Sequence, residues 1–193
     1  MNINRSLFAT LFSISIIISN KVMAIETPKH TLIKKENGFE IREYEPMIIA
    51  KTSVMSNYSD ATSTGFRRIA SYIFGGNSAN MSIKMTAPVL TNTPDPKDIY
   101  EIQFVMPSEH SMKNLPQPHS QDVTLKEVNL GRTAVLRFGG WATKDKASHY
   151  RNKLSDLLLA SGYTVNGTFM VAQYNSPWAI PPFRKNEIIV QIK

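Results

Sequence analysis

The chain has 193 residues, a formal net charge of +7 and no cysteine. The absence of cysteine excludes disulfides, thiolate metal sites and a cysteine nucleophile. Basic residues are scattered in short pairs such as Lys34-Lys35 and Arg67-Arg68. That pattern is typical of a solvated surface. A basic balance could also indicate nucleic-acid binding, but the N-terminus predicts export, and an exported protein rarely meets nucleic acid, so we expect no such partner.

Residues 1–24 have the composition of a cleavable signal peptide. Arg5 precedes an apolar run over residues 7–18, and Val22-Met23-Ala24 resembles a small-residue cleavage site. The run is shorter than the roughly 20 residues that a bilayer-spanning helix needs. We therefore expect a periplasmic or secreted protein, cleaved after Ala24, with no transmembrane segment in the mature chain. An uncleaved N-terminal anchor is the alternative.

The mature chain, residues 25–193, is long enough for one domain with a good core. Its first half begins near residue 36 with an apolar–polar alternation over residues 39–42, which predicts a half-buried strand. A second strand is predicted over residues 47–55. Ser59 or Asp60 is then expected to cap a helix that ends at Gly75-Gly76. Strands over residues 83–90 and 99–106 complete this half.

A proline-containing connection, residues 107–122, leads to a second half with the same order of elements. Strands are predicted over residues 123–128 and 133–138. A helix capped by Thr143 and stopped by Gly162 follows, and strands over residues 168–174 and 187–192 close the chain. The loop between these last two strands is unusually rich in apolar residues.

The two halves also repeat in sequence. Matches occur first at an offset of 84 and then, after a small insertion, at an offset of 86: Ile41-Arg42-Glu43 with Leu125-Lys126-Glu127, Ala50 with Ala134, Gly76 with Gly162, Met85 with Val171, and Glu101-Ile102 with Glu187-Ile188. A period this long is not that of a solenoid. It predicts two pseudo-symmetric halves, about residues 36–106 and 123–193, that form one α+β domain. We expect a distorted antiparallel β-barrel of about eight strands with two flanking helices.

Three blocks carry a resemblance to a known family. They are GFRRIASYI at residues 65–73 with Gly76-Asn77, IKMTAPV at residues 83–89, and YNSP at residues 174–177 followed by RKNE at residues 184–187. In this order and spacing they resemble the SOUL haem-binding protein family, and the resemblance extends from about residue 36 to the end of the chain. The family fold is a distorted barrel of two similar halves with two flanking helices.

The resemblance implies non-covalent binding of haem, porphyrin or another flat apolar anion in a shallow groove. In animal members the groove is bordered by the first helix and the loop before the last strand. The arginines among the corresponding residues would pair with propionates at the rim. The residues carried over in this way are Phe66, Arg67, Arg68, Ala70, Ile73, Trp178, Phe183 and Arg184.

Iron ligation is the one place where the pattern departs from the family. Some members carry a histidine, considered an axial ligand, at the position that Glu43 occupies here. A carboxylate is a poor substitute for imidazole as a haem ligand. The four histidines of the chain do not pair at zinc-ligand spacing either, so we predict no metal site.

Two other functions fit a two-half domain of this kind. A small-molecule hydrolase would use pocket Glu and Tyr residues such as Glu43, Tyr44 and Tyr72, but the sequence shows no nucleophile with an adjacent base. A protein-binding domain would instead dock a partner on the loop that contains Trp178. We favour ligand binding without catalytic residues.

Overall fold

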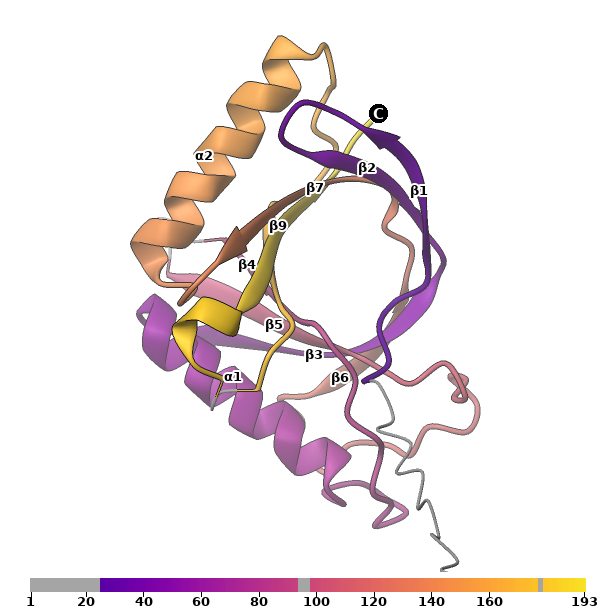
Figure 1. The fold of residues 1–193 in the computed structure, drawn as a ribbon. Helices are drawn as coiled ribbons and strands as arrows, with labels where there is room; N and C mark the ends of the chain where they lie inside the picture. Colours follow the sequence, from indigo (N-terminus) through magenta and orange to yellow (C-terminus); the bar gives the residue numbers. More distant parts are fainter. Residues whose placement is uncertain (1–24, 94–97, 177–178) are drawn as a thin grey trace, which may run out of the picture.

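The computed structural model describes residues 25–93, 98–176 and 179–193. In these residues nine strands form a single antiparallel sheet that curls into an open barrel, and two helices pack on its outside (Figure 1). The predicted α+β class is confirmed. The strands are β1 (His30–Lys35), β2 (Glu40–Tyr44), β3 (Met47–Met55), β4 (Val89–Asn92), β5 (Ile99–Val105), β6 (Thr124–Val128), β7 (Gly131–Gly139), β8 (Met170–Gln173) and β9 (Lys185–Gln191).

The order of the strands shows the predicted symmetry directly. The sheet runs β1-β2-β7-β9-β8-β4-β5-β3-β6. The strands β2 to β5 of the first half correspond, in the same sequence, to the strands β6 to β9 of the second half. When each strand is replaced by its counterpart, the order from β2 to β6 becomes the same order read backwards. A pseudo-twofold axis therefore passes between β4 and β8, which pair through Leu90 and Ala172.

Element boundaries follow the sequence offsets with one exception. β2 and β6, and likewise β3 and β7, are related by 84 residues, whereas β5 and β9 are related by 86. The match of Met85 with Val171 was wrong as a strand correspondence, because β4 begins only at Val89 while Val171 lies inside β8. Met85 is also substantially exposed.

One strand was missed from the sequence. All six residues of β1 are exposed, so this edge strand has no apolar–polar alternation to reveal it. Within the described part of the chain it pairs with β2 alone, from His30 opposite Tyr44 to Lys35 opposite Glu40. Lysines at an exposed edge also oppose pairing with another chain.

The helices begin at their capping residues. α1 (Tyr58–Ile73) is capped by Asn57, whose side chain accepts from the backbone N–H of Asp60, so the predicted start at Ser59 or Asp60 was slightly late. α2 (Lys144–Ala160) is capped by Thr143, as predicted. A short 3-10 helix, η1 (Pro181–Phe183), precedes β9.

α1 approaches the sheet closely at Gly65. A Cβ atom at this position would lie 2.5 Å from Cδ1 and Cγ1 of Ile102 in β5, a distance that real contacts do not reach. Ile69 and Ile73 of the same helix are buried beside it. The glycine therefore sets how deeply the helix lies against the sheet.

The curled sheet has two different faces. Its convex face carries the main core, formed with the two helices by residues such as Ile102, Leu154 and Ile188. Its concave face carries a smaller apolar cluster that includes Ile49, Val135 and Ile189. Polar residues of β2, β7 and β9 share that concave face.

Candidate functional site

A groove of about 640 Å³ lies between the two helices on the convex side of the sheet. Cavities that bind small ligands commonly measure about 300–1,000 Å³. The groove lies beside the pseudo-twofold axis, since residues of β4, Gln173 of β8, residues 58–67 of α1 and Lys144 of α2 line it together. Its lining residues are Tyr58, Ser59, Thr62, Ser63, Phe66, Arg67, Val89, Thr91, Trp141, Ala142, Thr143, Lys144, Gln173, Asn175 and Arg184.

The charges along this groove are all positive. Its described lining contains Arg67, Lys144 and Arg184 but no aspartate or glutamate. A second cavity, of about 410 Å³, has the opposite character, because Glu26, Glu45, Glu127 and a single lysine are among the residues that line it. The first groove is therefore the one suited to an anionic ligand.

Arg184 stacks on an aromatic side chain that also lines the groove, Trp141. Its Cζ atom is 3.5 Å from the centroid of the Trp141 ring, the geometry of a cation–π interaction. Arg184 is only 7% exposed, whereas Trp141 is half exposed. The Arg184 guanidinium covers one face of the Trp141 indole, and the rest of the indole surface is accessible from the groove.

The structure brings together only some of the predicted site residues. Phe66, Arg67 and Arg184 line the groove. Ala70 and Ile73 lie instead in a small crevice under α1, where Ile73 is part of the core. Arg68 faces the other side of α1, where it donates to the Ser53 carbonyl at 3.0 Å and pairs with Asp122 at 3.4 Å.

The apolar loop before β9 contributes less to the described groove than the sequence suggested. Phe183 is strongly exposed on η1 and is not among the residues that line the groove. Trp178 lies outside the described residues. Asn175 and Arg184 are the lining residues supplied by the described part of residues 175–184.

Sequence reasoning missed the side of the groove formed by α2. Trp141 and Lys144 flank the cap of that helix, and Tyr58 is the first residue of α1. Tyr58 and Lys144 are 86 residues apart, the offset that relates β5 to β9. The repeat itself was the available signal, since a twofold axis brings equivalent elements together.

The described groove lining offers no usual axial ligand for haem iron other than a phenol. It contains no histidine or methionine, and the phenol is that of Tyr58. Glu43 is an exposed residue of β2, a strand that does not line the groove. Among the described residues, no group of three or more His, Asp and Glu side chains is arranged to hold a metal ion.

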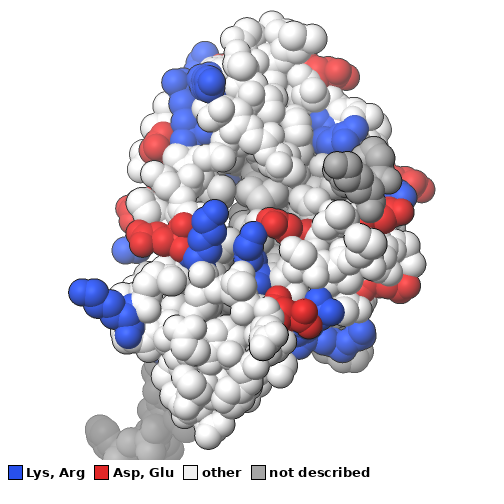
Figure 2. Space-filling view, turned by 180° about the vertical axis from the view of Figure 1, so that it is seen from behind, with Lys and Arg blue, Asp and Glu red and all other residues white. Residues whose placement is uncertain are grey.

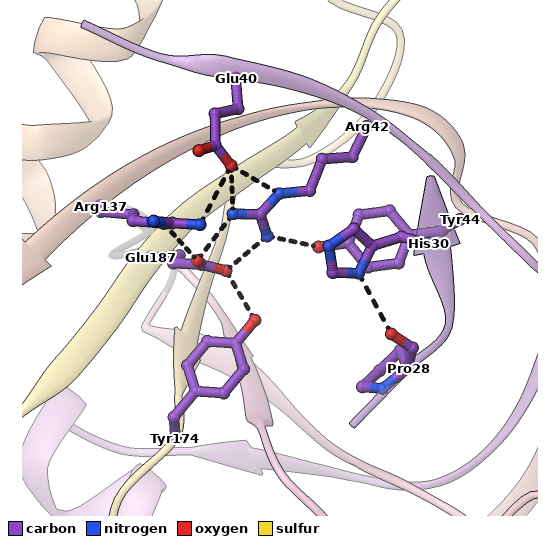
Figure 3. Close-up of polar contacts among 8 residues, drawn as sticks. All are labelled: Pro28, His30, Glu40, Arg42, Tyr44, Arg137, Tyr174 and Glu187. Carbon is purple, nitrogen blue, oxygen red and sulfur yellow. Dashed lines mark hydrogen bonds and ion pairs between the residues drawn. The ribbon is translucent and has the colours of Figure 1, made fainter. Parts of the chain in front are cut away.

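The concave face carries a dense polar network (Figure 3). All five N–H donors of Arg42 are used: two bind Glu187 at 3.0 Å, two bind Oε2 of Glu40 at 2.6 and 3.0 Å, and one binds the Tyr44 hydroxyl at 3.1 Å. Tyr174 donates to Glu187 at 2.6 Å. Arg42 and Glu187 are both buried, so this ion pair lies in the interior of the open barrel.

Both charges of the pair are maintained. Burial alone would raise the pKa of the Glu187 carboxyl, but hydrogen bonds from Arg42 and Tyr174 and the charge of Arg42 outweigh it and lower the pKa. Burial and the nearby Glu187 charge raise the pKa of Tyr174, so the phenol keeps its proton and remains a donor. The network stabilises the fold rather than binding a ligand. The two carboxylate oxygens of Glu187 already accept hydrogen bonds from Arg42, Arg137 and Tyr174.

The lowered pKa of Glu187 predicts a loss of stability in acid. A carboxyl whose pKa is lower in the folded protein contributes stability above its ordinary value of 4.5, and that contribution disappears as the pH falls through the folded-state pKa. Urea unfolding followed from pH 7 to pH 2 should show this loss. In Glu187→Gln, the free energy of unfolding should fall less steeply with decreasing pH below pH 4.5, because the titrating carboxyl has been removed. If the dependence on pH is unchanged, the loss of stability in acid does not come from Glu187.

The residues considered for a hydrolase do not form a site. Glu43 is exposed, whereas Tyr44 belongs to the concave network. Tyr72 is buried under α1 and donates to the Pro116 carbonyl at 3.0 Å. These three side chains therefore lie in three separate environments.

The described residues form no broad basic face on the side of the molecule opposite to the view of Figure 1. Lys and Arg side chains are interspersed there with Asp and Glu around a hollowed centre (Figure 2). Among the described residues, no helix is long and apolar enough to cross a membrane.

The comparisons with known proteins agree with the fold and the motifs. A family model described as SOUL heme-binding protein matches residues 25–191. The chain belongs to this family. Among the similar proteins is human heme-binding protein 2, which is 31% identical over 165 residues and covers 80% of each chain. Heme-binding protein 1 of Xenopus laevis is 25% identical over 157 residues, 78% of this chain and 82% of the relative.

Solved structures share the SOUL-family fold at low sequence identity. A hydrolase from Listeria innocua aligns with a TM-score of 0.57 at 9% identity, over 83% of this chain and 94% of its own. The C-terminal domain of EcmrR aligns with a TM-score of 0.62 at 13% identity, over 80% and 96%. These likenesses concern the fold alone, so the function has to be inferred from the groove.

Proposed function

We propose that this SOUL-family protein binds haem, porphyrin or a similar flat apolar anion non-covalently in the groove between its helices, and that it has no catalytic activity. The observation that carries the proposal is the groove lining, which combines aromatic side chains with three cations and no carboxylate in its described part. The heme-binding proteins similar to this chain support the same ligand class.

The groove fits the two chemical parts of such a ligand. Phe66 and Trp141 offer aromatic surface, which favours stacking against a flat ring. Arg67 lies at the exposed wall of α1, where its side chain donates to Thr64 at 3.1 Å and retains further donors for a propionate. The ring would therefore be held by apolar contact and its anionic groups by cations, with the iron making no essential bond to the described lining.

Titration with haemin and with iron-free mesoporphyrin tests this function. We expect dissociation constants within about threefold of each other, because apolar burial and rim charges are common to both ligands. Trp141→Ala should weaken both about tenfold, since it removes a large aromatic surface and the partner of Arg184. Quenching of the porphyrin fluorescence and the Soret band report the binding.

Phe74→Ala is the matched control for that variant. Phe74 is an exposed aromatic residue at the end of α1 and does not line the groove, so the affinity should stay unchanged. Binding that requires iron, or a folded Trp141→Ala protein with the affinity of the natural sequence, would contradict the proposed function.

We also propose export of the protein to the periplasm or beyond. The composition of residues 1–24 supports this, although these residues lie outside the described structure. The intact mass of protein recovered from a bacterial periplasmic extract should correspond to a chain that begins at Ile25. A full-length product retained in the membrane fraction would contradict the proposal.

A further inference from the structure

Three large apolar residues are exposed at the end of the barrel where the pairing of β7 with β9 ends. Trp141 follows β7, Ile180 precedes η1, and Phe183 ends η1 just before β9 (Figure 1). These residues are 51%, 58% and 74% exposed, respectively. We call Trp141, Ile180 and Phe183 the apolar tip.

The two loops that carry the apolar tip are fixed to each other. Arg184, directly after Phe183, stacks on the Trp141 ring at 3.5 Å. Asn186 donates to the carbonyl of Gly140, the residue before Trp141, at 2.7 Å. η1 also contacts β7. The exposure of the apolar tip is therefore a property of the folded domain.

The backbone of η1 is suited to an apolar surrounding. Pro181 and Pro182 have no N–H group that needs a partner. The N–H groups of Phe183 and Arg184 each donate, at 3.1 Å, to the carbonyl three residues earlier. A backbone donor without a partner is costly in a lipid surrounding. These four residues can therefore enter a lipid interface without leaving such a donor unpaired.

The charge around the apolar tip is mainly positive. Lys144, Lys146 and Lys185 lie within five residues of it in the sequence, and all three are at least partly exposed. Residues 139–146 and 179–185 contain one carboxylate, that of Asp145. Lys144 also pairs with Asp98, at 3.9 Å. Lysines beside an apolar segment are attracted to anionic lipid headgroups, so this charge favours an anionic surface.

The size of the apolar tip favours a lipid surface over a protein partner. A large aromatic side chain presents about 150–250 Å² when fully exposed, so the three partly exposed residues present roughly 400 Å². A specific protein interface buries about 800 Å² on each partner. A lipid interface does not require that area, because single aromatic and aliphatic side chains insert between headgroups.

We propose that the apolar tip docks on an anionic lipid surface, with Ile180, Phe183 and the Trp141 ring inserted at the headgroup boundary and the neighbouring lysines next to the phosphates. The proposal does not depend on the ligand of the groove. Because Trp141 also lines the groove, docking places this side of the groove next to the lipid.

Cosedimentation with vesicles tests the docking. The chain that begins at Ile25 is used, because the apolar run of residues 7–18 could itself bind lipid and the described strands and helices all lie within residues 25–193. We expect it to bind vesicles of equal parts phosphatidylcholine and phosphatidylglycerol. Ile180→Ser with Phe183→Ser should bind them at least about tenfold more weakly, because two apolar side chains no longer insert. Phosphatidylcholine alone, or high salt, should weaken the binding of the natural sequence.

Leu159→Ser is the matched control. Leu159 is an even more exposed apolar residue, but it lies in the last turn of α2, whereas the apolar tip lies beside the start of that helix. This variant should bind the vesicles as the natural sequence does. The double variant should also keep its mesoporphyrin affinity within about twofold, since neither Ile180 nor Phe183 lines the groove. Circular dichroism checks that each variant is folded.

The outcomes separate this proposal from the proposed function. If the natural sequence does not bind the vesicles, or if the folded double variant or Leu159→Ser behaves in the opposite way, the docking is overturned and the porphyrin titration stands. Concentration-dependent dimers that the double variant loses, without vesicle binding, would assign the apolar tip to a second copy of the chain and overturn the lipid. Vesicle binding without porphyrin binding would overturn the proposed function and support the docking.

Discussion

Replacing Arg42 with methionine should lower the free energy of unfolding by about 3–5 kcal/mol, because it leaves the buried carboxylate of Glu187 without its ion-pair partner. Arg42 supplies two of the hydrogen bonds to Glu187 and is itself almost fully buried. The uncompensated charge, rather than the lost attraction, accounts for most of the effect. Urea unfolding at pH 7 followed by circular dichroism measures it.

The pseudo-symmetry offers a matched control for this experiment. Glu101 is the counterpart of Glu187 at the offset of 86, and it pairs with Lys51 at 3.0 Å on the same sheet. Both of these side chains are partly exposed, so Lys51→Met should change the free energy of unfolding by no more than about 1 kcal/mol. Equal effects at Arg42 and Lys51 would show that burial does not govern the strength of the network.

The double variant Arg42→Met with Glu187→Leu separates the two causes further. Replacing both members of a buried ion pair by apolar residues is often neutral, whereas removing one member is not. We expect this variant to recover most of the stability lost in Arg42→Met alone. No recovery would mean that the remaining contacts of Arg42, to Glu40 and Tyr44, carry the stabilisation.

Gly65→Ala should destabilise the protein by about 1–3 kcal/mol, even though alanine favours a helix over glycine by about 1 kcal/mol. The added Cβ would overlap Ile102, so α1 has to shift away from β5. Because α1 forms one wall of the groove, porphyrin affinity should fall as well. Thermal unfolding and porphyrin titration of the same preparation report the two effects.

Gly139→Ala provides the comparison for this variant. A Cβ at Gly139 would meet only the Arg184 carbonyl oxygen, at 3.6 Å, which is an ordinary contact. Its stability should stay within about 1 kcal/mol of the natural sequence. A Gly65→Ala protein as stable as this control would show that α1 is not fixed by the close approach at Ile102.

Much of the fold could be predicted because the repeat fixes equivalent elements without any knowledge of their contacts. The paired boundaries of β3 and β7 follow directly from an offset visible in the sequence. β1 could not be found in this way, since it has no counterpart in the second half and no buried residue to give a pattern.

The site was less predictable, because it depends on how the halves meet. The helix stripe that includes Phe66 and Ile73 could be predicted, but its division between groove and core depends on the depth of α1 against β5. Arg42 and Glu187 are 145 residues apart, and local patterns say nothing about such a pair. Lys144 joins Tyr58 only because β4 and β8 pair at the axis.

The order of the strands also has a consequence for how the two halves hold together. β2 of the first half pairs with β7 of the second, and β6 of the second half pairs with β3 of the first. Neither half alone can pair the edges of all its strands, because one strand of each half forms its backbone hydrogen bonds with a strand of the other half. The domain is therefore interlocked and should unfold as a single cooperative unit. In form it is a strand-exchanged dimer joined into one chain by residues 107–122.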